Sequence, residues 1–150
     1  MSTAKRSQSR SAARLAAVQA LYQHEMDATP TASLLDQFHR HRLGRDVDDE
    51  QLAEAEAEFF DDVVSGTIAR LEEIDELLTH RLSENWSLER LDLTMLQILR
   101  CGAYELIARP DVPVGSAISE YVDVAHAFFD PPEAKFVNGV LDAVAKEVRG

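Results

Sequence analysis

The side chains that could do chemistry are scattered along this 150-residue chain and form no recognisable catalytic pattern. The sequence holds no glycine-rich phosphate loop, no GxSxG or HExxH motif and no pair of cysteines, the patterns that would gather phosphate-binding amides, a nucleophile or metal ligands. Its histidines are expected to be surface residues or hydrogen-bonded helix residues. These are His24, His39, His41, His80 and His126. The sequence therefore predicts no enzyme, no cofactor and no metal site.

A basic arm precedes an acidic body. The first 14 residues contain Lys5, Arg6, Arg10 and Arg14 and no acid, whereas the other 136 residues carry 11 basic and 27 acidic groups. The three arginines are spaced by four residues and would share one helix face, where they repel one another unless an anion neutralises them. The pattern indicates a phosphate-binding face in a chain of net charge −12. The alternative is a solvated or flexible segment without a partner.

Aromatic and amide side chains favour single-stranded RNA as the anion, because rings stack on bases and amides bond to base edges. Tyr22 follows the basic arm, and Lys135, Phe136 and Asn138 stand close together near the other end of the chain, after Phe128. Tyr22 and Phe136 are expected near the surface that carries the arginines. The alternative is that the aromatic residues pack in the core.

The stretch Leu91–Ala108 is predicted to be the helix around which the chain is built, because apolar residues fall on all its sides. Asp92 suits its N-cap and Pro110 stands just past its end. Gly102 and Ala103 would let a neighbouring helix approach closely. Its three charged residues argue against a membrane span.

Apolar residues recur at helical spacing in the rest of the chain, and no strand-like alternation of useful length occurs. The sequence predicts an all-α fold of about seven helices. The other six are expected near residues 9–27, 31–42, 46–62, 67–82, 114–129 and 131–148, with a break at Gly66.

The N-terminal segment is expected to divide into an arm and a helix. Residues 1–8 are polar and serine-rich and are predicted to be a flexible basic arm, followed by a single helical domain over residues 9–150. The residues expected on the inward face of the first helix are Leu15, Val18, Tyr22 and Met26.

Between Asp46 and Asp62 the chain holds nine acidic residues and no basic one. This segment is interpreted as the outer side of an amphipathic helix, with weak binding of a divalent cation at Glu54 and Glu58 as the alternative. Cys101, the single cysteine, is expected to be a buried thiol inside the central helix. Without disulfides or an apolar leader segment, the sequence predicts a cytoplasmic protein.

Several motifs resemble the NusB family of bacterial transcription antitermination factors. They are ARLAAVQALYQHEM (13–26), ILRCGAYEL (98–106), the VP turn at 112–113 before AISEYVDVA, and KFVNGVLD (135–142). The resemblance implies an all-helical fold of two small bundles around a long shared helix. By position, it places Arg6, Arg10, Arg14, Tyr22 and Lys135–Gly139 on the family's pattern.

The resemblance also implies a role and partners. Members of the family pair with NusE, a small-subunit ribosomal protein, and bind the boxA element of ribosomal RNA transcripts. The chain would then support processive transcription, meeting the RNA polymerase elongation complex indirectly. Two alternatives remain: an acidic helical scaffold that binds only proteins, and a stand-alone relative of the NusB-like domain of RNA cytosine methyltransferases. Whether the chain is a monomer or a homodimer stays open.

Overall fold

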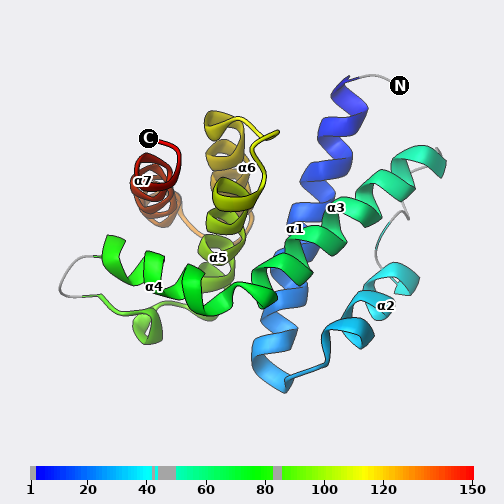
Figure 1. The fold of residues 1–150 in the computed structure, drawn as a ribbon, viewed down its shortest axis with the longest axis horizontal. Helices are drawn as coiled ribbons and strands as arrows, with labels where there is room; N and C mark the ends of the chain where they lie inside the picture. The colour runs from blue at the N-terminus through cyan, green and yellow to red at the C-terminus, as the bar shows by residue number, and fades with distance from the viewer. Residues whose placement is uncertain (1–2, 42, 44–49, 83–85) are drawn as a thin grey trace. The chain divides into compact units, whose positions relative to one another are not determined.

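The computed structural model of the chain describes residues 3–41, 43, 50–82 and 86–150, with residues 3–7, 51 and 52 described by their backbone alone. These residues form seven α-helices, one short 3-10 helix and no strand (Figure 1). The elements are α1 (Thr3–Asp27), α2 (Thr31–His41), α3 (Glu50–Ala69), α4 (Leu71–Arg81), η1 (Leu88–Arg90), α5 (Leu93–Ala108), α6 (Val114–Phe128) and α7 (Pro131–Val148). The predicted all-α fold is confirmed.

The helices group into two compact units, residues 1–68 and residues 69–150. The first unit contains α1, α2 and α3, and the second contains α4 to α7 with η1. Two helical units agree with the two bundles that the family resemblance implies. The single domain over residues 9–150 stays a prediction, because compact units within one chain need not fold independently.

Helix α1 differs from its prediction at its start and in its buried face. It begins at Thr3, not near Ser9, so its backbone covers most of the segment assigned to a flexible arm. Tyr22 and Met26 were expected to face inward, but their side chains are 40% and 64% exposed. The buried side chains are Ala13, Ala16, Ala17, Val18, Ala20 and Leu21, together with Ser9 and Arg14. Small alanines form most of this face, so the size of an apolar side chain was a poor guide to its direction.

In the first unit, α2 contacts both of its partner helices. It packs against α1, and the ring of Phe38 stacks on that of Phe60 in α3 with centroids 5.3 Å apart. Next to this pair, His39 Nε2 lies 2.6 Å from Asp61 Oδ1. The acidic residues Asp46, Asp48 and Asp49 lie outside the described residues.

The break between α3 and α4 falls at Arg70, not at the predicted Gly66. Helix α3 continues through Gly66 to Ala69, because a glycine inside a helix lowers its stability without ending it. Arg70 stands before the first turn of α4, where its Nε and Nη2 atoms each donate to Glu73 at 2.9 Å. The negative charge of Glu73 also suits the start of a helix.

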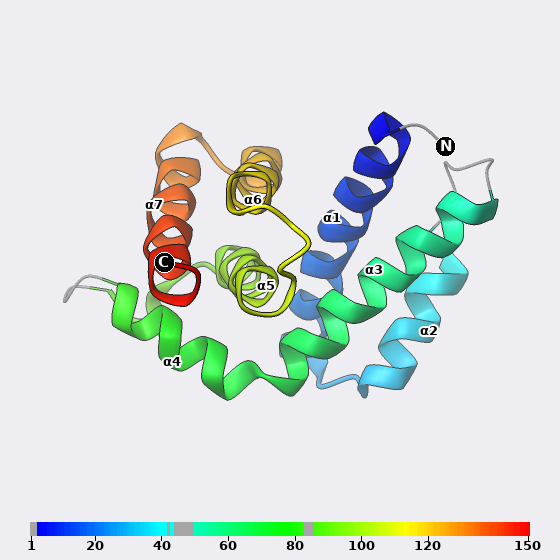
Figure 2. The same cartoon turned by 45° about the horizontal axis from the view of Figure 1, so that its top comes forward.

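Helix α5 is the centre of the second unit and contacts α4, α6 and α7 (Figure 2). Every residue from Met95 to Leu106 is buried, which confirms the prediction of a surrounded helix. Asp92 caps it as predicted, because its Oδ1 accepts from the backbone N–H of Thr94 at 2.8 Å. A Cβ on Gly102 would lie 2.7 Å from Leu141 Cδ1, so the absence of a side chain lets α5 and α7 approach.

The C-terminal end of α5 is closed by Arg149, a residue to which the sequence analysis assigned no role. Its guanidinium donates to four backbone carbonyl oxygens at 2.6–3.0 Å. These belong to Glu105, Leu106, Arg109 and Val112. Carbonyl groups at a helix end have no partner within the helix, and a cation is favourable there. Arg149 therefore joins the end of the chain to the central helix.

Glu105 and Cys101 are ionisable side chains of α5 that are fully buried in the core of this unit. Tyr121 of α6 donates a hydrogen bond to the fully buried Glu105. Cys101 is also fully buried, as expected, and burial raises the pKa of its thiol well above the ordinary value, with the nearby Glu105 carboxylate adding to the effect. The thiol is therefore an unreactive core group.

Candidate nucleic-acid interface

Arg10 and Arg14 form what we call the arginine face of α1. Their guanidinium carbons lie 4.7 and 4.9 Å from the ring centroid of Phe59 in α3. The spacing of four residues thus brings both cations to one place, as predicted. Arg14, however, is only 3% exposed, whereas an open cation was expected from the sequence. Its charge is held against an aromatic ring, an interaction that strengthens when water is excluded.

Lys5 and Arg6 lie on the helical backbone of α1, and their side chains lie outside the described residues. Because α1 begins at Thr3, Arg6 and Arg10 are four residues apart on continuous helix. The helical backbone therefore agrees with the prediction that the arginines share one helix face. The contact of Lys5 and Arg6 with phosphates stays a prediction.

Tyr22 is exposed on the surface of the first unit. At 40% exposure it is not a core residue, so the alternative of core packing is wrong for this position. The adjacent Gln23 donates to Gln37 of α2 at 2.9 Å, and His24 Nδ1 lies 2.9 Å from the carbonyl oxygen of Thr29. Tyr22 thus stands on a part of α1 whose neighbouring side chains are held by hydrogen bonds.

In the second unit, α7 presents three of the predicted residues, which we call the α7 face: Lys135, Phe136 and Asn138. Lys135 and Asn138 are exposed, and Phe136 is partly buried. The face is positioned by a start signal that the sequence analysis recognised, with Pro131 and Pro132 in the first turn and Glu133 just after them. Its opposite side packs into the core through Val137 and Leu141.

Phe128, at the end of α6, is 43% exposed, so core packing is wrong for this residue too. Its ring centroid lies 6.4 Å from that of Phe129, which ends the helix in an extended conformation. The connection from α6 to α7 therefore carries one exposed ring, that of Phe128, and one ring, that of Phe129, which lines a cavity beside α7.

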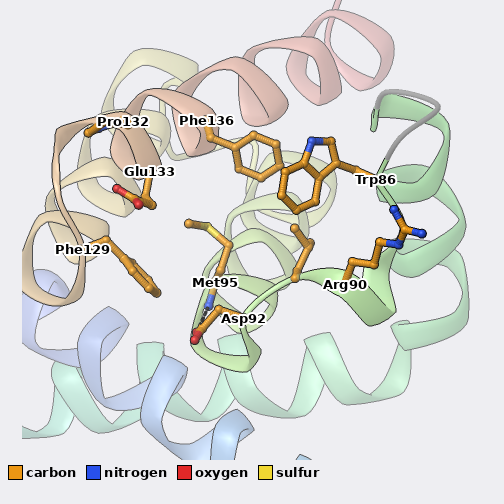
Figure 3. A pocket seen from close by; sticks show the side chains of 9 residues that line it. Trp86, Arg90, Asp92, Met95, Phe129, Pro132, Glu133 and Phe136 are labelled. Carbon is orange, nitrogen blue, oxygen red and sulfur yellow. Dashed lines mark hydrogen bonds between the residues drawn. The ribbon is translucent and has the colours of Figure 1, made fainter.

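A cavity of about 400 Å³ lies beside the α7 face. Trp86 and Phe136 border one side of it with ring centroids 6.0 Å apart, Phe129 and Glu133 lie on the other side, and Met95 lies between them (Figure 3). The remaining lining residues are Arg90, Leu91, Asp92 and Pro132. Trp86 was not among the binding residues predicted from the sequence. An available signal was a lone tryptophan in a polar link outside every predicted helix.

The predicted RNA residues are divided between the units. Arg10, Arg14 and Tyr22 belong to the first, and Phe128 and the α7 face belong to the second. A common surface for the two groups stays a prediction. Within the described residues, no group of three or more His, Cys, Asp and Glu side chains could hold a metal ion. None of the helices in that part of the chain is long and apolar enough to cross a membrane.

Comparison with known proteins places this geometry in a family. The sequence model of the NusB family matches residues 11–146, and the chain belongs to the NusB family. It is 63% identical to the transcription antitermination protein NusB of Sphingopyxis alaskensis over 97% of each chain.

Solved structures of NusB proteins are similar to the fold of this chain. A crystal form of NusB from T. maritima is 32% identical with a TM-score of 0.75, over 92% of this chain and 91% of that one. A crystal structure of the antitermination factors NusB and NusE in complex with double-stranded RNA contains a chain that is 26% identical with a TM-score of 0.74. That match covers 93% of this chain and 98% of the other.

Proposed function

We propose that this chain is a transcription antitermination factor that binds boxA RNA of ribosomal RNA transcripts together with NusE. In this role it works in the cytoplasm, supports processive transcription without catalysis, and meets the RNA polymerase elongation complex indirectly. The observation that carries the proposal is the likeness, over nearly the whole of both chains, to a protein crystallised with NusE and RNA. Exposed residues at the predicted positions on α1 and α7 support it.

The RNA contacts are proposed to divide by chemistry. On α1, Lys5, Arg6 and Arg10 contact phosphates, and Arg14 supports them from its place on Phe59. Tyr22 and Phe128 offer exposed rings for stacking. On the α7 face, Lys135 supplies charge, Phe136 a ring edge, and Asn138 an amide that can both donate to and accept from a base.

NusE is proposed to be needed for tight binding. The chain has a net charge of −12, so its body repels a phosphate chain and only a few cations attract it. A second RNA-binding protein on the same complex links two weak contacts, which raises the affinity of each by raising its effective concentration. The alternative hypothesis, an acidic helical scaffold that binds only proteins, predicts no such linked binding of RNA. The match over 97% of the Sphingopyxis relative favours antitermination over the domain of a methyltransferase.

The test is the affinity for a fluorescently labelled single-stranded boxA RNA, measured by anisotropy with and without NusE. We expect weak binding by the chain alone and at least about tenfold tighter binding in the joint complex, equivalent to about 1.4 kcal/mol of coupling. A scrambled RNA of equal length is the control. Equal boxA affinity with and without NusE would contradict linked binding, and an absence of RNA binding in both cases would favour the protein scaffold.

A further inference from the structure

We propose that the cavity between Trp86 and Phe129 binds one unpaired nucleobase of the RNA and prefers a base that carries an amino group. This inference rests on the proposed RNA-binding function and deepens it, because it assigns base selection to a site outside the predicted residues. Trp86 and Glu133 are the two residues proposed to contact the base.

The walls of the cavity suit a flat aromatic ligand. Trp86 is 50% exposed although it is the largest apolar side chain of the unit, and the ring of Phe136 is tilted by 47° against it (Figure 3). An indole face left open to water gains by covering, and bases stack on such faces whatever their sequence. The volume of about 400 Å³ lies in the range of ordinary small-ligand sites.

The polar edge of the cavity indicates which base fits. The Oε2 atom of Glu133 is buried and has no hydrogen-bond partner among the described residues. An ionised carboxylate only accepts hydrogen bonds, so it needs a donor. The amino groups of cytosine, adenine and guanine are such donors, whereas the one base-edge donor of uracil, N3–H, is flanked by two carbonyl oxygens that repel a carboxylate. Asp92, the other carboxylate here, is already used, because it accepts from the backbone N–H groups that begin α5.

Cations near the cavity favour an RNA strand as the partner that supplies the base. Arg90 is exposed and lies beside Trp86 at the rim (Figure 3), and Lys135 follows on α7 next to Phe136. These cations suit the phosphates on either side of an inserted base. A lysine or arginine of a protein partner is the alternative donor for the Glu133 carboxylate, and adding NusE without RNA tests that occupant. The cavity also continues the α7 face, since Phe136 belongs to both.

The test uses the single tryptophan of the chain, Trp86, whose fluorescence reports on this cavity alone. The complete chain with NusE is titrated with single-stranded boxA RNAs in which each position in turn is exchanged between cytosine and uracil. We expect fluorescence quenching on binding, and one position where uracil binds about tenfold more weakly, the effect of one lost hydrogen bond to a charged group.

Substitutions at two positions in the cavity separate base reading from folding. Glu133→Gln adds an amide donor, so the preference for cytosine at that position should disappear while overall binding persists. Trp86→Ala should weaken binding and Trp86→Phe should restore most of it. Val148→Ala, an exposed apolar change elsewhere on α7, is the matched control and should alter neither. Thermal melting of each variant shows that the fold is retained.

Three results overturn the proposal. Joint RNA binding with constant Trp86 fluorescence and no position-specific preference removes the cavity from the interface and leaves the proposed function standing. Full quenching by NusE alone, with no further change on adding RNA, assigns the cavity to a protein side chain. An absence of RNA binding even with NusE defeats the proposed function, and the nucleobase site fails with it.

Discussion

The arginine face of the first unit and the α7 face of the second offer RNA different chemistry and are built differently. Arg10 and Arg14 lie over Phe59, a ring that is itself buried, so positive charge there depends on the core. Phe136 and Trp86 instead border a cavity at the surface. A change beneath the arginine face should therefore act through folding, whereas a change at the α7 face should act directly on binding.

Removing the ring beneath the arginine face should have the largest effect. Phe59→Ala deletes a buried aromatic side chain and both cation–π contacts, so we expect a loss of about 3–5 kcal/mol in the free energy of unfolding. Denaturant titration measures it. Phe136→Ala is the matched change in the second unit and should cost clearly less stability, because its ring is only partly buried. Equal losses in the two variants would break the comparison between the faces.

Tyr22→Ala tests whether an exposed ring of the first unit contacts RNA. We expect an unchanged melting temperature, because the side chain is 40% exposed, and a loss of on the order of 1–3 kcal/mol in binding to boxA with NusE. Anisotropy and thermal melting are measured on the same preparation. Met26→Ala, an exposed apolar change one helical turn further along α1, should leave both quantities unaltered. A large drop in melting temperature with normal binding by the folded fraction would count against the stacking role.

Arg14→Ala should separate the buried cation from its more open neighbour. The guanidinium of Arg14 is almost fully buried over Phe59, so its loss should lower the free energy of unfolding by about 0.5–2 kcal/mol. Arg10→Ala removes a partly exposed side chain and should lower it less. Denaturant midpoints of the two variants provide the measurement. A greater loss for Arg10→Ala would show that burial does not determine which cation supports the fold.

The smallest effects concern exposed carboxylates, one in each unit. Hydrogen bonds from the side chain and backbone of Thr29 lower the pKa of Asp27, and hydrogen bonds from Arg70 lower the pKa of Glu73. Because each folded-state pKa lies below the unfolded value, each carboxylate stabilises the fold above the ordinary carboxyl range and loses this contribution as the pH falls through its folded pKa. In the Asp27→Asn and Glu73→Gln variants, the melting temperature should fall slightly less than in the parent as the pH drops below about 4. Acid profiles identical to the parent would remove both contributions.

Local signals in the sequence predicted most of the fold. Helical spacing identified the helices, Asp92 and the prolines before α7 marked helix starts, and the apolar surround of α5 marked it as central. Each of these depends on residues close together in the chain. Where the prediction failed, as at Gly66, a single residue was given more weight than the helical pattern that continues past it.

The candidate site was less predictable, because it depends on partners distant in sequence. The exposure of Arg14 is set by Phe59 of another helix, and the direction of Tyr22 follows from the alanines that pack on the other side of α1. The cavity beside Trp86 forms only where the link before α5 meets the start of α7. No local pattern in the sequence predicts these contacts between distant residues.

The central claim is that the arginine face neutralises phosphates, while Phe136 of the α7 face contributes to base recognition. It is tested most directly by the affinity for boxA and for scrambled RNA across a range of salt concentrations, with NusE present, for Arg10→Ala and Phe136→Ala. Relative to the parent complex, Arg10→Ala should make the slope of log affinity against log salt shallower by about 0.7 and weaken both RNAs equally. Phe136→Ala should leave the slope unchanged and reduce the preference for boxA. The same change in slope and in preference for both variants would contradict the division between the two faces.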